Sequence, residues 1–473
     1  MRLALVLLVV LPLDAFAHAF GARYELPVPV WLFIAGGALT VTLTFVIVAA
    51  FSRGGAERYA GARWPLEATM LGRLLASTWV SAAAKVVCVA ALLLVILAGF
   101  IGTGDPNRNI APTLVWIVGW VGFSYFAMLV GNLWPLVNPW RTLYGMLSSD
   151  GGRRPFPPRL GGWLALAALL AFGWVELVFP FRATPMVLAW LVVAYSVLTW
   201  AGMARYGAQA WLDNVDPFHR AFALLARFAP LARGAEGGLV LRPPAAGLLA
   251  RGAADASAAE VGFIMAMLAI VLFDGVQGSK HWVALEDAIH EIDPKFGDGG
   301  WMALHSAGLL AMWLAFTGLY FAACAVARAA AGGAPATLDY ARAFAPTLIP
   351  IAIGYHFAHS FTYLLVQGQS LVFLVSDPLG LGWNLFGTRD FAPDIALIGT
   401  KTAWYLALGA IVIGHAISVY LAHVAAERLL EARGRALRAL VPMTILMVIY
   451  TIVSLQILAE PLVRYSGPQE TII

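Results

Sequence analysis

The feature that most constrains this chain is a series of about ten apolar runs, each long enough to cross a bilayer as a helix. A membrane-spanning helix needs about 20 predominantly apolar residues, and short polar segments separate these runs. The runs cover about residues 28–51, 81–102, 111–132, 161–179, 185–204, 257–276, 301–325, 345–373, 399–422 and 441–460. The sequence therefore predicts an all-α integral membrane protein with about ten transmembrane helices.

The composition supports the same conclusion. Of the 473 residues, 61% are hydrophobic and 12% are charged, whereas a soluble domain averages roughly 45–50% apolar and about 25% charged residues. This balance excludes a soluble enzyme, a disordered protein and a nucleic-acid-binding protein, and it makes the lipid bilayer the expected partner. Cys88 and Cys324, the two cysteines, each lie inside an apolar run. We therefore expect neither a disulfide framework nor a cysteine-rich metal site.

The first 17 residues have the pattern of a secretory signal peptide. Arg2 precedes an apolar run over 3–13, and an A-x-A site ends at Ala17. We expect cleavage after Ala17, which makes His18 the first residue of a mature polytopic membrane domain over 18–473. An uncleaved first helix is the alternative.

The loop charges predict an orientation. The loops that are expected to be cytoplasmic carry twenty Lys and Arg residues, and the outer segments carry eight. Because positive charges accumulate on the cytoplasmic side, we expect both termini to be periplasmic or exterior. A cytoplasmic loop is expected at about 205–256, with outer loops at about 277–300 and 374–398. Within the cytoplasmic loop, the basic amphipathic stretch 218–222 is expected to lie on the inner membrane surface.

Three histidines lie at membrane depth. His356 and His359, in the eighth span, are one helical turn apart, and Pro350 is expected to kink that helix and free a carbonyl. His415 lies at a similar depth in the ninth span. A cluster of all three histidines, holding a metal between adjacent helices, is geometrically possible. Packed histidines bonded to neighbouring helices are the alternative.

The outer end of the sixth span provides further candidates. Asp274 closes this span and is a metal ligand, a general base or a solvated helix end. After it come His290, Glu291 and Asp293, whose spacing resembles a metal site but is more typical of a solvated face. His305, near the outer start of the seventh span, is another candidate at the same level.

His18 provides a possible metal ligand of a different kind. After cleavage, its α-amine and its ring nitrogen would be available to one metal ion, and such donors suit Cu(II). The expected cofactor is therefore a divalent transition metal, Cu or Zn.

Several stretches resemble a bacterial family of polytopic membrane proteins that includes membrane-associated fenitrothion hydrolases. They are 25–33 (ELPVPVWLF), 138–141 (NPWR), 273–275 (FDG), 358–359 with 367–369 (AH, QGQ), 376–380 (SDPLG) and 385–388 (LFGT). The resemblance covers nearly the whole mature chain. It implies hydrolysis of a small apolar organophosphorus triester to a nitrophenol and a dialkyl thiophosphate, with a second membrane subunit as a possible partner. The family provides no established catalytic residues to carry over.

The chemistry of a triester suggests what the site has to do. The substrate has a good leaving group but needs a strong nucleophile at neutral pH, which a metal-bound water supplies. We expect such a metal on His356, His359 and His415, with Asp274 or the outer loop completing the pocket. Copper or other transition-metal transport, with His18 as a loading site, is one alternative. A b-type haem on His359 and His415 is another.

Overall fold

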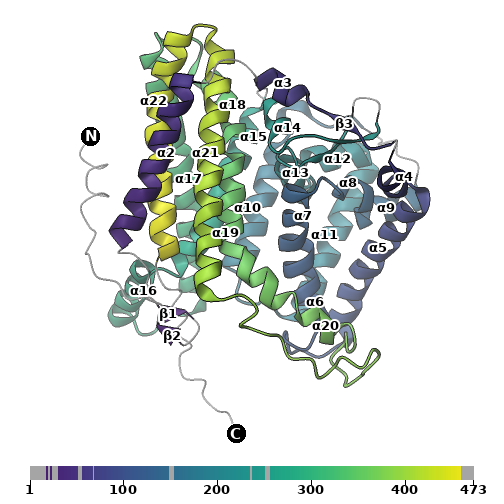
Figure 1. Ribbon diagram of the computed structural model, residues 1–473. Helices are drawn as coiled ribbons and strands as arrows, with labels where there is room; N and C mark the ends of the chain where they lie inside the picture. Colours follow the sequence, from purple (N-terminus) through teal and green to yellow (C-terminus); the bar gives the residue numbers. More distant parts are fainter. Residues whose placement is uncertain are drawn as a thin grey trace.

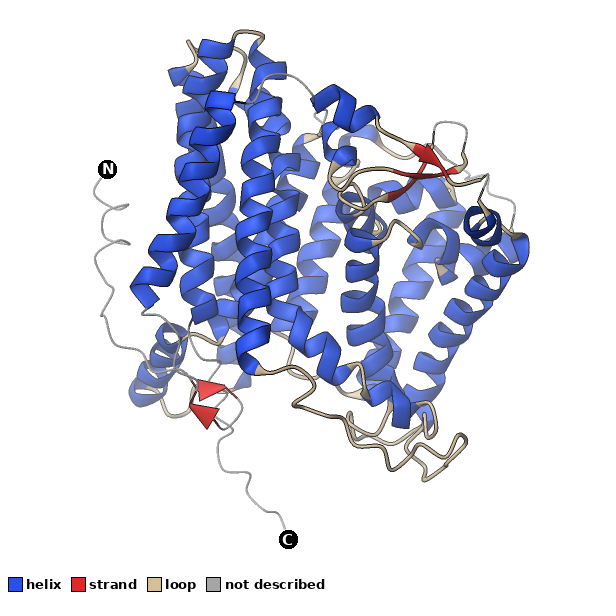
Figure 2. Cartoon of the chain, in the orientation of Figure 1, coloured by secondary structure: helices blue, strands red, loops and turns tan. Residues whose placement is uncertain are grey.

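The computed structural model describes residues 18–19, 22–23, 30–51, 56–67, 69–148, 154–234, 237–250 and 256–459. In these residues the chain is helical apart from loops and five very short strands (Figure 2). The expected signal peptide, 1–17, lies outside the described residues. His18 lies in strand β1 (His18–Ala19), which pairs antiparallel with β2 (Ala22–Arg23).

Ten helical segments in the described residues are long and apolar enough to cross a membrane, which confirms the predicted fold class. Figure 1 shows them running roughly side by side. Eight of them consist mainly of one long helix: α2 (Val30–Phe51), α5 (Thr78–Ile101), α10 (Trp163–Leu177, after the short η2, Pro158–Leu160), α11 (Pro185–Tyr206), α15 (Ala258–Gln277), α17 (Asp298–Ala330), α21 (Thr400–Leu430) and α22 (Arg433–Ala459).

The third span is built from three consecutive pieces. They are α6 (Ile110–Pro112), the π-helix η1 (Thr113–Gly122) and α7 (Phe123–Leu129). A π-helix of ten residues is unusual, because such turns normally occur singly, and they are frequent at functional sites. Its course places Trp120 near the centre of the bundle, against the eighth span.

The eighth span is also broken. It comprises α18 (Thr337–Phe344), the 3₁₀ turn η3 (Ala345–Leu348), α19 (Ile349–Gln367) and α20 (Ser370–Leu374). The kink expected at Pro350 is wrong in detail, because Pro350 lies in the first turn of α19. Proline is tolerated there, since the first turn has no intrahelical partner for its missing N–H.

Helix α15 is at the centre of the bundle. Of its membrane window, 78% is buried, against 17% for α2 and 22% for α5. It packs against α10, α17 and α19, and α19 in turn packs along α21. The crossing of α19 and α21 is close because Gly354 and Gly414 face each other there. Polar residues on α10, α15 and α19 are therefore brought to one interior region.

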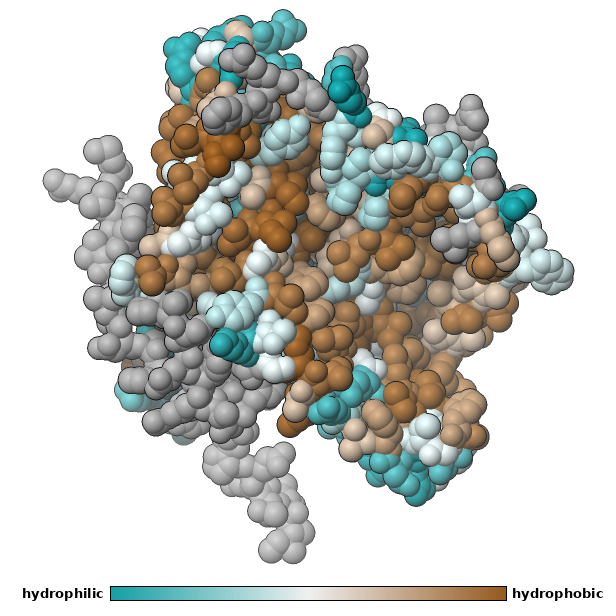
Figure 3. Space-filling view, viewed as in Figure 1, coloured by the Kyte–Doolittle hydropathy of each residue, from teal (hydrophilic) through white to brown (hydrophobic). Residues whose placement is uncertain are grey.

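The short elements gather at the two ends of the bundle (Figure 1). The α13 end carries α3 (Ala56–Gly61), α4 (Met70–Leu75), α8 (Trp134–Val137), α9 (Pro139–Leu147), α12 (Ala208–Asn214), α13 (Pro217–Leu225), α14 (Ala246–Leu249) and the antiparallel sheet β3 (Trp64–Pro65), β5 (Leu239–Leu241), β4 (Leu231–Arg233). The α16 end carries α16 (Lys280–Ile292), α20 and the irregular segment 375–399. Hydrophobic residues cover the middle of the face seen in Figure 3, and hydrophilic residues lie towards the two ends.

Helix α13 corrects one expectation. Its sequence predicted a helix on the membrane surface, but Phe222 is fully buried, along with most of the helix. Its basic residue Arg220 forms an ion pair with Glu260 of α15, which also pairs with Arg227. The amphipathic pattern therefore reflects a core contact on one face and an internal ion pair on the other.

The close crossing of α19 and α21 makes a stability prediction. In Gly414→Ala the new methyl group meets the backbone carbonyl oxygen of Pro350, which cannot move aside as a side chain can. We expect a loss of about 1–3 kcal/mol, seen as a lower midpoint of thermal unfolding in detergent. Gly409→Ala, on the same helix, meets nothing within 4 Å and should be neutral or stabilising by up to about 1 kcal/mol. Equal midpoints for the two variants would contradict this packing.

Candidate functional site

The centre of the candidate site is a contact between Asp274 and His359. Asp274 lies in the last turn of α15, and His359 lies on α19, which packs against it. His359 Nε2 is 2.6 Å from Asp274 Oδ2, a distance typical of a short, charge-assisted hydrogen bond. The two side chains keep 24% and 44% of their surface exposed. The pair therefore lies at membrane depth without being sealed in the core.

This contact determines which ring nitrogen of His359 carries a hydrogen. A carboxylate only accepts hydrogen bonds, so His359 donates through its Nε2–H. In the neutral ring the lone pair then belongs to Nδ1, which becomes the atom that accepts a proton. A carboxylate that orients a histidine in this way also stabilises the imidazolium that forms. The arrangement is thus suited to general-base chemistry.

Glu176 is a functional candidate that the sequence reasoning missed. It lies in the last turn of α10, within electrostatic range of Asp274, His359 and Arg182. The sequence does contain a feature that could have identified it, because Glu176 is the single ionisable residue in the helix Trp163–Leu177. An ionisable residue inside an apolar span is a functional candidate by default. With Glu176, the site has two carboxylates around one histidine.

The ring of Tyr355 packs beside the Asp274–His359 pair. It lies one turn before His359, and the two rings stack with centroids 6.5 Å apart and an angle of 13°. A Cβ atom at position 275 would come 3.0 Å from the Tyr355 hydroxyl. Gly275 therefore gives this hydroxyl room beside Asp274.

His356 packs against aromatic side chains of the third span. Its ring lies against Trp120 of η1 and Tyr125 of α7, with centroids 6.3 and 5.6 Å apart. The Tyr125 hydroxyl donates to the Phe357 carbonyl at 3.0 Å. His356 is buried, and its Nε2 has no hydrogen-bond partner among the described residues.

His415 is held separately on α21. It is 1% exposed, and its Nδ1 is 2.8 Å from the Ile411 carbonyl. Because a carbonyl oxygen only accepts, Nδ1 carries the hydrogen and Nε2 carries the lone pair. This Nε2 is buried and has no partner in the described part of the chain.

The structure does not bring the three predicted metal ligands together. Across the described ranges, no group of three or more His, Cys, Asp or Glu side chains is placed to hold a metal ion. The helical geometry explains the separation of His356 from His415. Gly354 faces α21, and a residue two positions later on an α-helix is rotated by about 200°. His356 therefore faces away from α21, and the cluster predicted from adjacent spans does not form.

A second polar network lies at the α16 end. Glu286 Oε1 accepts hydrogen bonds from Trp282 Nε1 and lies 2.7 Å from His305 Nε2. His305 Nδ1 is in turn 2.9 Å from the amide of Gln277, on the last turn of α15. The loop expected at 277–300 thus contains a 13-residue helix tied to the end of the central span. His290, Glu291 and Asp293 lie exposed on or just after it, as a solvated face does.

The α13 end has a polar cluster of its own. His219 Nε2 lies 3.2 Å from Asp213 Oδ1, and this hydrogen bond lowers the pKa of Asp213. Asp216 caps α13 by accepting from the His219 backbone N–H at 2.9 Å. Burial raises the pKa of Asp216. We interpret this cluster as structural, because its contacts fix the start of a buried helix.

Comparison with known proteins adds no assignment: no family model matches the chain, and no curated protein or solved structure is similar to it. The interpretation of the site therefore depends on its geometry.

The Glu286 network makes a local prediction. Glu286→Ala removes the acceptor of two hydrogen bonds, a loss of about 1–3 kcal/mol. We expect the amides of α16 to exchange with deuterium roughly tenfold faster. Glu291→Ala, an exposed change on the same helix, is the matched control and should leave exchange unchanged. Equal exchange rates in the two variants would show that Glu286 does not hold α16.

Proposed function

We propose that this chain is a membrane-embedded hydrolase of organophosphorus triesters that uses His359 and Asp274 as its acid–base pair. The observation that carries the proposal is the 2.6 Å contact between these side chains inside an apolar bundle. Ionisable side chains at membrane depth are costly and are typical of functional sites. The substrate class comes from the resemblance to membrane-associated fenitrothion hydrolases.

The residues support a simple route for hydrolysis. His359 Nδ1 takes one proton from a water molecule as the water oxygen attacks phosphorus. The bond between phosphorus and the aryl oxygen breaks, and the aryloxide leaves with its electron pair. Asp274 stabilises the imidazolium, and Glu176 lies within electrostatic range of it. General-base assistance of this kind contributes typically 10²–10⁴-fold to a rate.

The membrane location suits the substrate. A small apolar triester partitions into the bilayer and reaches the site from the side. From the charge bias of the loops we propose that the α16 end faces the periplasm or exterior of a bacterial inner membrane. A second membrane subunit, which the resemblance implies, is part of the same proposal.

Turnover of fenitrothion by the reconstituted protein tests the acid–base pair. We expect nitrophenol release by His359→Asn and Asp274→Asn to fall 10²–10⁴-fold through kcat, with KM nearly unchanged, because these side chains act on the water. His290→Asn, an exposed histidine of α16, is the matched control and should keep wild-type activity. Wild-type turnover in His359→Asn, or no turnover by the wild type, would refute the proposal.

Transition-metal handling is the second candidate function. The observation that favours it is the state of His415, whose Nδ1–H is bonded to a carbonyl while Nε2 keeps a free lone pair. Metal-binding histidines are commonly oriented by such a bond. His356 Nε2 is similarly unpartnered among the described residues. In this candidate, Cu or Zn is the cargo and His18 would load it.

Elemental analysis of the purified protein distinguishes the two candidates. If the second holds, wild type grown with Cu and Zn carries about one equivalent of metal, and His415→Leu loses it. His290→Leu should retain the metal. Chelation should then remove metal without abolishing triester hydrolysis by the pair. A wild type without bound Cu or Zn would exclude the metal role and leave the hydrolase proposal standing.

A further inference from the structure

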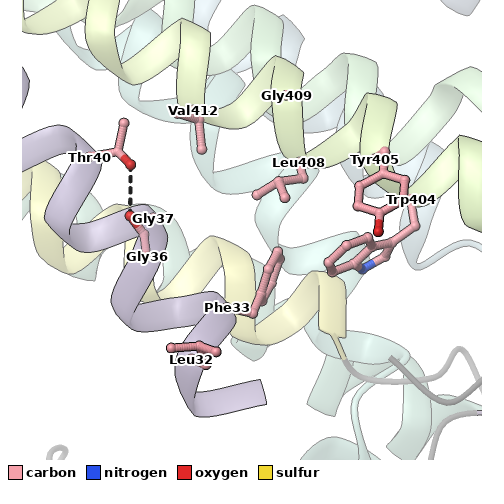
Figure 4. Close-up of a pocket in the computed structure, with 10 residues that line it drawn as sticks. All are labelled: Leu32, Phe33, Gly36, Gly37, Thr40, Trp404, Tyr405, Leu408, Gly409 and Val412. Atoms are coloured by element: carbon pink, nitrogen blue, oxygen red, sulfur yellow. Dashed lines mark hydrogen bonds between the residues drawn. The ribbon is translucent and has the colours of Figure 1, made fainter. Parts of the chain in front are cut away.

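A groove runs along the flank of the bundle between α2 and α21 (Figure 4). Its volume is about 520 Å³. At one end the rings of Phe33 and Trp404 are in contact, with centroids 4.7 Å apart. The groove then extends past Gly409 to Val412. Eight residues of helix separate Trp404 from Val412, so the groove is about 12 Å long.

The surface of the groove is mostly apolar. A Cβ atom added at Gly36 or at Gly409 would meet nothing within 4 Å, so both positions open into the groove. The hydroxyl of Thr40 is directed to the Gly36 carbonyl, to which it donates at 2.8 Å (Figure 4). The Thr40 hydroxyl therefore already has an acceptor, and Gly36 and Gly409 have no side chain, so these positions do not require a polar ligand.

The surroundings indicate that the bilayer provides the occupant. Only 17% of the α2 window is buried, and large apolar side chains beside the groove, such as Leu39 and Ile413, are about 60% exposed. The volume and length give a cross-section of roughly 40 Å², about half that of a helix 10 Å across. Flexible acyl chains fit a groove of this width.

A positive charge at one end of the groove indicates that the occupant has a phosphate headgroup. Lys401 lies in the first turn of α21, and its Nζ is 6.0 Å from the centre of the Tyr405 ring, which lines the groove. Trp and Tyr are typical of the membrane–water interface, and a lysine there attracts lipid phosphate. We propose that the groove is a phospholipid site, with acyl chain along Gly36 and Gly409 and phosphate at Lys401.

Native mass spectrometry of the delipidated full chain tests this site. With added phosphatidylglycerol, we expect the wild type to bind one lipid that Gly409→Leu does not bind, because the new side chain fills the groove. Gly318→Leu is the matched control, since Gly318 is exposed on α17 and also has nothing within 4 Å. Gly36→Leu, on the opposite wall, tests the same site independently should Gly409→Leu fail to fold.

The headgroup is tested separately. Lys401→Gln should weaken phosphatidylglycerol binding roughly fivefold and leave binding of a diacylglycerol with the same chains unchanged. Lys295→Gln, which removes another lysine at the α16 end, should have no effect. Equal lipid retention by wild type, Gly409→Leu and Gly36→Leu would overturn the groove as the site. Equal affinity of wild type and Lys401→Gln would overturn the phosphate contact.

Discussion

The cost of a polar side chain at membrane depth governs how this bundle is assembled. A group that loses water and finds no partner destabilises the fold by several kcal/mol, so each buried polar residue constrains its neighbours. Asp274 meets His359 across the packing of α15 and α19. Glu260, near the other end of α15, meets two arginines. The most buried of the ten spans thus has one polar contact near each end, and both tie it to other elements.

Breaks in regular helix position the residues around the Asp274–His359 pair. The π-helix η1 brings Trp120 against His356 and close to Glu176. The 3₁₀ turn η3 restarts the eighth span at α19, and this sets which face of α19 meets α15 and which meets α21. With one uninterrupted helix in either span, these side chains would face other directions. Such irregularities carry a cost and are typically retained at functional sites.

The fold was largely predictable from the sequence, and the site only in part. Ten apolar runs define ten spans because length and hydropathy alone decide whether a helix can cross a bilayer. Asp274 and His359 were both identified as candidates, but their pairing depends on helix packing that no periodicity encodes. The three-histidine cluster was wrong because the rotation of α19 against α21 is set by contacts of Gly354 and Gly414. Glu176 was missed, although the sequence shows it as the single ionisable residue in the helix Trp163–Leu177.

The two carboxylates around His359 bear on the choice between the functions. Asp274 accepts the Nε2–H of His359 and stabilises the imidazolium that forms when Nδ1 takes up a proton. A general base needs this property, and so does a group that passes protons. Copper and zinc ions are instead bound by neutral imidazole nitrogens, and the Nε2 atoms of His356 and His415 have no partner among the described residues. The side chains suited to acid–base chemistry and the unpartnered imidazole nitrogens thus belong to different residues, and substitutions can remove one set without the other.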